Sequence, residues 1–200
     1  SYYNSDRDNY GPNSWDNYKA KGKRNSYSYK VSRNFTKSYN FVGGLDLIED
    51  EALISNNKRS SDLKGFFIEN IFDLNNDFTI TLGARQDKHS KFGNQTVYRN
   101  TLAYRTDRFI YKGSFGTGYR APSLYELFAT TFGNESLKPE KSKNFDLGLT
   151  TSFFGPSIKF SSTFFSNTIK DRIAFSGGGY KQVTTLEERE GLEIDIDYKI

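Results

Sequence analysis

Residues 191–200 read Gly-Leu-Glu-Ile-Asp-Ile-Asp-Tyr-Lys-Ile, and this stretch decides the fold class. Apolar side chains occupy every second position, and every residue between them is charged: the apolar set is Leu192, Ile194, Ile196, Tyr198 and Ile200. Successive side chains of a β-strand point to opposite faces, so the spacing predicts a strand with one apolar face and one charged face. Two classes of protein use such a strand. One is a soluble β-sandwich with a wetted sheet face, and the other is a membrane β-barrel with lipid outside and a polar lumen.

The composition fits a barrel and excludes helical membrane spans. Only 35% of the residues are hydrophobic and 26% are charged, and no apolar run reaches the length of a spanning helix. A barrel gives only alternate strand residues to lipid, so its average composition looks soluble. Aromatic residues make up 16% of the chain, which favours strands and supplies the girdles that barrels carry at both membrane interfaces.

Several function classes are excluded by what the sequence lacks. There is no cysteine, which removes disulfide scaffolds, cysteine-based zinc sites and thiol catalysis. The lone histidine, His89, cannot build a histidine metal centre, and we interpret it as a polar loop residue. The net charge of +4 is spread without a basic block, which argues against nucleic acid. We therefore expect no enzyme activity, no resident cofactor and no bound metal.

Turn signals divide the chain into roughly nine or ten strands of about 10 to 14 residues. The alternating segments are 24–35, 41–47, 62–74, 78–85, 95–105, 108–119, 144–153, 157–166 and 191–200. Strands of this length suit a tilted membrane crossing, whereas soluble strands usually have about five or six residues. The pattern predicts an all-β fold, an antiparallel transmembrane β-barrel.

The predicted connections differ in length at the two ends of the strands. Short turns are expected at 36–38, 75–77, 106–107 and 155–156, and longer polar loops at 4–11, 55–58, 87–94, 120–141 and 176–179. Short periplasmic turns with long extracellular loops are typical of outer-membrane barrels. The chain has no initiator Met or signal peptide and stops within a strand pattern, so we expect residues 1–200 to be part of a larger barrel domain.

The most specific motifs lie between residues 113 and 149. Residues 116–122 read Gly-Thr-Gly-Tyr-Arg-Ala-Pro, residues 124–128 read Leu-Tyr-Glu-Leu-Phe, and residues 134–142 read Asn-Glu-Ser-Leu-Lys-Pro-Glu-Lys-Ser. Pro122 and Ser123 are expected to start a short helix, whose apolar stripe is Leu124, Leu127 and Phe128.

This ordered set resembles the TonB-dependent outer-membrane receptors, whose barrels carry these three motifs in the same order. The positions that match are Gly116, Gly118, Tyr119, Arg120, Ala121, Pro122, Leu137, Pro139, Glu140, Lys141 and Ser142. The later Glu190-Gly191-Leu192-Glu193 is similar to the Gly-x-Glu strand of the family. Within the family, the spacing looks most like the cobalamin-receptor branch, with siderophore and haem receptors as the nearest relatives.

The resemblance implies a barrel of about twenty-two strands in the outer membrane of a Gram-negative bacterium, filled by a plug domain that is absent from this chain. It implies active import of a scarce nutrient, such as cobalamin or an iron chelate, driven by the TonB energy-coupling complex through the missing N-terminal part. The partners would be the plug, outer-membrane lipid and the small-molecule substrate. The polar lumen wall would hydrogen-bond the plug, with Arg85, Glu193, Asp195 and Asp197 among its residues.

Five aromatic residues in predicted outer loops are candidates for stacking on a corrin, haem or catecholate ligand: Tyr10, Trp15, Tyr18, Tyr125 and Phe132. Interface belts and loop packing explain exposed aromatic residues equally well. Ser123 and Glu126 beside Arg120 suggest a hydrolase, but no histidine stands near them in the sequence to act as the base. Asp6, Asp8 and Asp16 offer oxygen ligands suitable for calcium, but their spacing does not follow the ordered calcium-loop template, which favours a solvated loop.

Two alternatives stay open. A passive porin or adhesin barrel without a plug would be favoured by a gene that lacks a plug-sized domain upstream. A soluble carbohydrate-binding β-sandwich would be favoured if the isolated chain stays monomeric without detergent, although the predicted strands are long for that fold.

Overall fold

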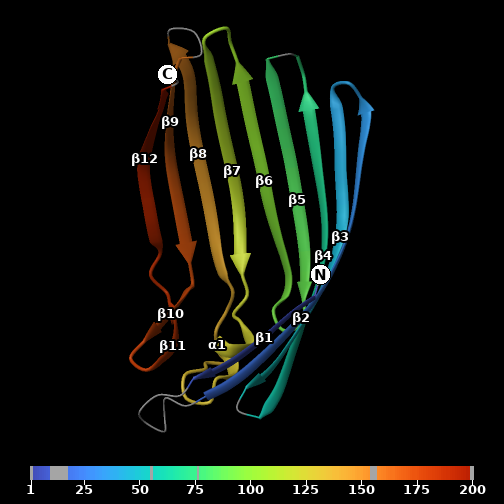
Figure 1. The fold of residues 1–200 in the computed structure, drawn as a ribbon, viewed down its shortest axis with the longest axis vertical. Coiled ribbons are helices and arrows are strands. Elements are labelled where there is room, and N and C mark those ends of the chain that lie inside the picture. The colour runs from blue at the N-terminus through green and yellow to red at the C-terminus, as the bar shows by residue number, and fades with distance from the viewer. Residues whose placement is uncertain (1, 10–17, 55, 76, 154–156, 199–200) are drawn as a thin grey trace.

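The chain folds as one curved antiparallel sheet with a small lobe at one end (Figure 1). The computed structural model describes residues 2–9, 18–54, 56–75, 77–153 and 157–198, with side-chain burial from Lys21 onward. The elements are β1 (Tyr2–Asn9), β2 (Tyr18–Thr36), β3 (Tyr39–Ile54), β4 (Asn57–Asp73), β5 (Phe78–His89), β6 (Gly93–Arg105), β7 (Phe109–Arg120), α1 (Leu124–Phe128), β8 (Glu140–Phe153), β9 (Ile158–Lys170), β10 (Arg172–Ser176), β11 (Gly179–Val183) and β12 (Glu187–Tyr198). Within these ranges, no helix is long and apolar enough to cross a bilayer.

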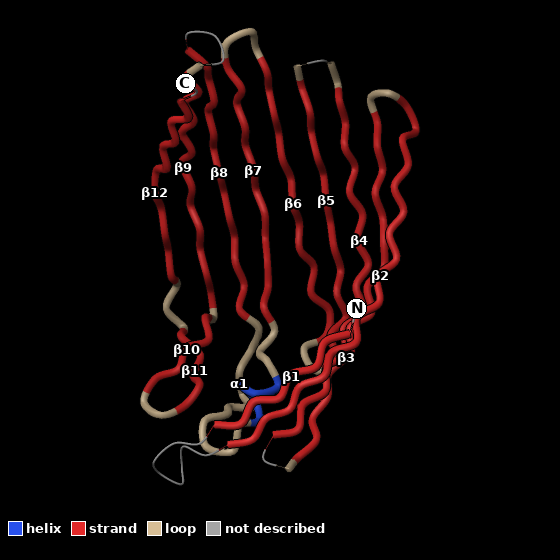
Figure 2. Tube along the Cα trace, in the orientation of Figure 1, coloured by secondary structure: helices blue, strands red, loops and turns tan. Residues whose placement is uncertain are grey.

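The sheet is an up-and-down meander in which β1 to β9 follow one another and β12 closes the order. The remaining two strands, β10 and β11, form a separate hairpin inserted between β9 and β12. The strands curl, and the ends of β1 to β4 that lie far from the short connections sweep across the view toward α1 (Figure 2). Helix α1 contacts β3 and β4, so it lies on the concave side of the sheet. This curvature is that of part of a barrel wall.

The register places the apolar residues of the closing stretch on one face of the sheet. Leu192 lies opposite Phe164, and Ile196 lies opposite Phe160. Leu192 and Ile196 are 62% and 68% exposed, so this apolar face is not covered by the rest of the chain. Other exposed apolar side chains on the same face are Tyr27, Tyr29, Leu45, Leu47, Phe66, Leu82, Tyr98, Leu102, Tyr111, Phe115, Phe145 and Leu147. The predicted two-faced strand is confirmed, and the pattern extends over the whole sheet.

A row of stacked aromatic rings follows the end of the sheet where the connections are short. The Tyr39 and Phe72 ring centroids are 4.9 Å apart, and those of Phe78 and Tyr104 are 4.2 Å apart. Tyr111 continues the row at 6.0 Å from Tyr104. Aromatic side chains prefer the interface between hydrocarbon and water, so this row has the position and composition of a membrane girdle.

On the concave face, two glycines make room for phenylalanine rings on neighbouring strands. A Cβ atom at Gly44 would lie 2.5 Å from Cζ of Phe67, and one at Gly191 would lie 2.5 Å from Cζ of Phe165. Each ring therefore lies flat over a glycine of the adjacent strand, a cross-strand pairing that stabilises glycine-containing sheets. The glycine of the Gly-x-Glu motif is explained by this contact.

One segment predicted as a loop is a strand, and another is the turn of a hairpin. Residues 4–11 were expected to form a loop, but β1 pairs with β2 through Asn9. The expected glycine-rich loop at 176–179 is the turn of the β10–β11 hairpin, in which Gly177 and Gly178 have φ angles of 60° and 82°. Strand β1 lies at the loop end of the sheet, beyond the apolar band, where alternation with an apolar face does not signal a strand.

The loops expected at 55–58 and 87–94 are also shorter than predicted. Strand β4 begins at Asn57, β5 continues to His89 and β6 begins at Gly93. The sheet extends past the length needed to cross a bilayer, since β2 has 19 residues and β4 has 17. Polar sequence beyond the apolar band therefore continues as strand, and the described connections that are long at this end are 121–139 and 171–186.

The two faces of β9 predict opposite responses to a new charge. Phe164 is on the apolar face, and its neighbour Thr163 is on the polar face opposite Glu193. We expect Phe164→Lys to lower the free energy of unfolding of the intact protein in lipid vesicles by about 2 to 4 kcal/mol, because lysine near the bilayer midplane is costly. Thr163→Lys is the matched control and should change stability little. Equal losses in urea titrations of both variants would contradict the two-faced sheet.

Candidate functional site

The long connection at 121–139 and the β10–β11 hairpin pack into one unit, which we call the loop lobe (residues 121–139 and 172–183). Leu127, Leu137 and Ile173 form its core and are 3%, 2% and 8% exposed. Tyr180 packs against them. Leu137 belongs to the predicted motif set, and the structure shows that it is part of this buried core.

Hydrogen bonds between the two segments hold the lobe together. The backbone N–H of Tyr180 donates to the carbonyl oxygen of Phe132 at 2.8 Å. The Asn134 side-chain amide donates to the Tyr180 carbonyl at 3.0 Å. The Lys138 N–H donates to Oε1 of Gln182 at 2.7 Å. Segments about 45 residues apart in the chain are thus joined edge to edge.

Arg120, the last residue of β7, connects this lobe to the sheet. Its Nε and Nη2 donate to the two carboxylate oxygens of Glu140 at 2.8 and 2.9 Å, a bidentate pair across β7 and β8. Its Nη1 reaches Oε2 of Glu126 on α1 at 3.0 Å. A guanidinium can make both contacts because its donors form a planar fork. The sequence predicted Arg120 and Glu140 as motif residues, and the structure brings them together.

Ser123 and Glu126 cap the helix. The Ser123 Oγ accepts the N–H of Glu126 at 3.2 Å, and Glu126 Oε2 accepts the N–H of Ser123 at 2.7 Å. This reciprocal pair is a capping box, which satisfies two backbone donors at the start of a helix. The predicted short helix is confirmed. The serine, glutamate and arginine that suggested a hydrolase are adjacent because they form the cap and its link to the sheet.

The Glu140 carboxylate also fastens the β10–β11 hairpin, since its Oε1 accepts the N–H of Ile173 at 2.6 Å. Its hydrogen bonds with Arg120 lower the pKa of Glu140 below the ordinary 4.5, and the Ile173 N–H acts in the same direction against the effect of burial. Glu140 is therefore ionised throughout the neutral range. Arg120 and Glu140 lie at the loop end of β7 and β8, beyond the apolar band.

The other motif residues surround this connection. Pro122 is buried and lies beside Ala121 at the exit from β7. Gly118 faces Ser142 on β8 so closely that a Cβ atom would lie 2.8 Å from Ser142 Oγ. The pairing of β7 with β6 ends at Gly116, and the Tyr119 hydroxyl donates to Asp87 Oδ2 at 3.0 Å. Pro139 immediately precedes β8, and Lys141 is exposed on the outward face of that strand.

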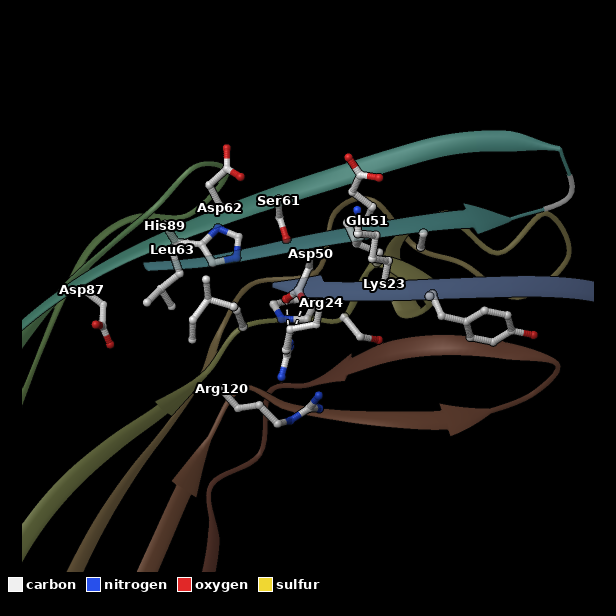
Figure 3. Close-up of a pocket in the computed structure, with 18 of the residues that line it drawn as sticks. Lys23, Arg24, Asp50, Glu51, Ser61, Asp62, Leu63, Asp87, His89 and Arg120 are labelled. Atoms are coloured by element: carbon white, nitrogen blue, oxygen red, sulfur yellow. Dashed lines mark hydrogen bonds and ion pairs between the residues drawn. The ribbon is translucent and has the colours of Figure 1, made fainter. Parts of the chain in front are cut away.

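A cavity of about 920 Å³ lies on the concave side between the loop lobe and β2 to β5 (Figure 3). The cationic residues that line it are Lys23, Arg24 and Arg120, and the acidic residues are Asp50, Glu51, Asp62 and Asp87. The negative charges of the acidic residues offset the positive charges of the cationic ones. The Arg24 guanidinium, for example, donates from Nη2 to Asp50 Oδ2 at 2.8 Å.

His89 lies in the wall of this cavity, where the sequence had suggested an ordinary loop residue. It is the last residue of β5 and is 8% exposed. The N–H of Lys91 donates to its Nδ1 at 3.1 Å, so that nitrogen is unprotonated. Burial lowers the pKa of His89, while Asp50 and Asp62 act in the opposite direction. The imidazole is therefore neutral at pH 7.

Deeper in the concave face, Arg85 joins two carboxylates. Its Nη1 contacts Asp46 on β3, and its Nη2 lies 2.8 Å from Asp87 Oδ1. The guanidinium crosses β4 at Gly65, where a Cβ atom would clash with it. This places Arg85 in the polar wall, as the alternation predicted. Across the described ranges, no group of three or more histidine, aspartate or glutamate side chains is arranged to hold a metal ion.

Two of the five aromatic residues predicted to contact a ligand, Tyr125 and Phe132, lie in the loop lobe. Tyr125 lines the cavity and its ring centroid is 6.3 Å from that of Tyr180, while Phe132 lies 5.5 Å from Phe175. Phe175 and Tyr180 face each other across the β10–β11 hairpin and were missed. The signal was present, because they flank the four residues 176–179 symmetrically, as hairpin partners do. Tyr10 and Trp15 lie outside the described residues, and Tyr18 begins β2 rather than lying in a loop.

The connection made by Arg120 predicts the effect of removing its fork. Arg120→Lys keeps the charge but cannot bind Glu140 in bidentate fashion and reach Glu126 at once. Because hydrogen bonds between charged groups contribute about 1.5 to 3 kcal/mol and Arg120 is half exposed, we expect cleavage within residues 121–139 of the intact protein to accelerate about tenfold. Arg99→Lys on β6 is the matched control. Unchanged cleavage rates in limited proteolysis would show that Arg120 does not anchor the lobe.

The pKa of Glu140 predicts how the lobe responds to acid. A carboxylate with a depressed folded-state pKa contributes stability above its unfolded pKa, and this contribution is lost as the pH falls through the folded value. The Ile173 amide should therefore stay protected from hydrogen exchange at pH 5 and lose protection only well below pH 4.5. The Tyr180 amide, which donates to a backbone carbonyl, is the internal control and should not change at that step. Parallel loss at both amides would contradict a role for Glu140.

The comparisons with known proteins agree with this geometry. A family model described as "TonB dependent receptor-like, beta-barrel" matches residues 1–199. The vitamin B12 transporter BtuB of Vibrio cholerae is 25% identical over 209 residues, which cover 92% of this chain and 32% of that protein. The BtuB of Photobacterium profundum is 24% identical over 135 residues, 66% of this chain and 22% of that protein. The chain thus spans about a third or less of these relatives.

Solved structures share the fold at lower identity. The siderophore receptor PirA from Pseudomonas aeruginosa superposes with a TM-score of 0.79 at 19% identity, over 90% of this chain and 40% of that one. A variant of the ferric enterobactin receptor PfeA from the same species gives 0.79 at 20% identity, over 98% of this chain and 37% of that one. Together with the family match, the curved two-faced sheet and the motif-built loop lobe establish that this chain belongs to the TonB-dependent receptor-like β-barrel family.

Proposed function

We propose that residues 1–200 form part of the barrel wall of an outer-membrane receptor that actively imports a corrinoid of the cobalamin class. The observation that carries this proposal is the cavity on the concave side, at the end of the sheet where the loop lobe lies. A substrate arriving from outside would meet this cavity before it reached the lumen. The likeness to vitamin B12 transporters over most of the chain supports the same substrate class.

The charges around the cavity favour a nearly neutral ligand. Its three cationic residues face four acidic ones, and the best placed of the cations, Arg24 and Arg120, are already engaged by Asp50 and by Glu126 and Glu140. A ferric catecholate is a multiply charged anion, which binds best to a site with an excess of cations. A corrinoid is large, amphiphilic and rich in amide groups, so paired charges can serve it as hydrogen-bonding partners.

Tyr125 is the aromatic residue best placed to contact such a ligand. It lines the cavity, and its ring stands edge-on to Tyr180, which is itself packed against the core of the loop lobe. An aromatic face held in this way loses little conformational freedom on binding. Phe132 lies against Phe175 and is half-buried, so we assign it to packing within the lobe.

The polar concave wall would contact the plug of the complete receptor. Arg85, Asp46 and Asp87 form one fixed group on it, and the charged face of β12 supplies Glu193, Asp195 and Asp197. Transport through a plugged lumen requires work, and TonB coupling would supply it by acting on the plug rather than on this segment. The wall makes and breaks no bonds in the substrate.

Equilibrium binding to the intact receptor tests the proposal. We expect saturable binding of cyanocobalamin and no comparable binding of ferric enterobactin. Tyr125→Ala should raise the Kd for cyanocobalamin about tenfold, since one aromatic contact contributes about 0.5 to 1.5 kcal/mol beyond its buried area. Tyr104→Ala, in the aromatic row at the other end of the sheet, is the matched control and should leave the Kd unchanged.

If the receptor bound ferric enterobactin and not cyanocobalamin, the proposed substrate would be an iron chelate and not a corrinoid. Uptake that proceeds without proton motive force would instead favour a passive pore. A Tyr125→Ala variant with the Kd of the unaltered receptor would remove Tyr125 from the site.

A further inference from the structure

The Tyr119 side chain crosses the sheet from its outward face to its concave face. The register between β7 and β8 is continuous, and Tyr119 lies directly opposite Lys141, which shares the outward face with Phe145. Directly paired residues of neighbouring strands point to the same face, so the register places Tyr119 on the outward face as well. Its hydroxyl nevertheless donates to Oδ2 of Asp87 at 3.0 Å, and Asp87 lies in the wall of the concave cavity.

The crossing is possible because the sheet is open between β6 and β7 at the loop end. The last pair of these two strands is Arg99 with Gly116. Beyond it, residues 93–98 of β6 pair only with β5, and residues 117–120 of β7 pair only with β8. We call this opening the split. Tyr119 lies at its edge and can turn through it, whereas paired backbones about 4.8 Å apart leave no room for a ring.

Tyr119 stands between two spaces that meet at the split. One is the concave cavity of about 920 Å³, and the other is a cleft of about 560 Å³ that residues 94–98 and 117–119 line from its two sides. Among the described residues, Tyr119 is the only one that lines both spaces. One half-buried side chain therefore separates the cavity from the outward face of the sheet.

The hydrogen bond to Asp87 holds the ring in the split. Asp87 is 4% exposed and its Oδ2 also accepts Nε of Arg85 at 3.0 Å, so the acceptor is fixed in the wall. Burial raises the pKa of Tyr119, and the charge of Asp87 acts in the same direction, so the hydroxyl stays protonated and remains a donor. In the described chain, the other hydrogen bond across the split runs from the Tyr98 N–H to Thr117 Oγ1 at 2.9 Å. Two hydrogen bonds thus join the edges of the split directly.

We propose that Tyr119 is a latch that closes an opening through the sheet, between the concave cavity and the outward face. While its hydroxyl is bound to Asp87, the ring fills the split and the cavity is closed on that side. When the hydrogen bond breaks, the ring returns to the outward face, the edges of β6 and β7 part, and the cavity and the cleft become one passage. This inference goes beyond the proposed function, because it concerns how the cavity is closed and applies to any ligand that occupies it.

The test measures the width of the split in the intact receptor in lipid vesicles, without ligand. Gln86→Cys on β5 and Glu188→Cys on β12, as the only cysteines of the protein, place nitroxide labels on the two sides of the split, because both residues are exposed on the outward face. Double electron–electron resonance gives the distance between the labels, roughly 24 Å along the sheet at the usual strand spacing. A second pair, Leu82→Cys with Leu192→Cys, spans the same strands where the ladder is continuous and is the internal control.

Tyr119→Phe keeps the ring and removes the hydroxyl. Because a hydrogen bond to a charged acceptor shifts an equilibrium about 10- to 100-fold, we expect this variant to populate a second distance between positions 86 and 188, longer by about 5 Å, the spacing of one strand. Tyr119→Ala, which also empties the split, should populate the longer distance at least as much. Tyr111→Phe is the matched control and should leave the distance unchanged, since Tyr111 is on the same strand and face but lies opposite Tyr104 in the paired part.

Three results would overturn the latch. They are an unchanged distance between positions 86 and 188 in both Tyr119 variants, an equal lengthening in Tyr111→Phe, and an equal lengthening between positions 82 and 192, which would show a general loosening of the sheet. The experiment uses no substrate, so its outcome is separate from that of the proposed function. Cyanocobalamin binding with an unchanged split defeats only the latch, and a widened split without cyanocobalamin binding defeats only the substrate assignment.

Discussion

A strand inside a bilayer must have every backbone N–H and C=O paired, because hydrocarbon offers no partner for them. The rest of this structure depends on that constraint. The ladder from β1 to β9 and on to β12 supplies the pairing, and it fixes which side chains share a face. Once the faces are fixed, every second residue meets lipid and the others meet the lumen. Among the described strands, the ladder between β6 and β7 opens beyond Gly116, at the loop end, where water or headgroups can satisfy the backbone.

The sequence predicts the fold wherever a strand crosses the apolar band. In residues 191–200 and 144–153 the alternation of apolar side chains is enough to give both the strand and its orientation. It fails for β1 and for the outer ends of β2 to β4, because a strand beyond the apolar band carries no regular alternation of apolar and polar residues. Those segments are strands because the neighbouring strands pair with them. The local sequence alone does not predict that pairing.

The loop lobe shows a different limit of prediction. The motif residues from Gly116 to Ser142 marked the region, and the capped helix could be read from Pro122 and Ser123. The contact of these motif residues with the β10–β11 hairpin could not be predicted, because the hairpin lies some 30 residues later in the chain. Arg120 meets Glu126 and Glu140, and through Glu140 it holds Ile173. The motif is thus a connector between a barrel strand and its outer loops, and it positions Tyr125 at the cavity.

The central claim is that one face of this sheet meets lipid and the other meets the polar, hydrated interior of the barrel. The chain contains no cysteine, so single cysteines can be introduced at each position from 192 to 197 of the intact protein and labelled with nitroxide. The measurement is the collision rate of each label, in lipid vesicles, with oxygen and with a water-soluble nickel chelate. The account predicts a period of two with opposite phases, oxygen collisions being highest at 192, 194 and 196 and chelate collisions at 193, 195 and 197. Equal access of the chelate to both sets would contradict it and would place both faces in water.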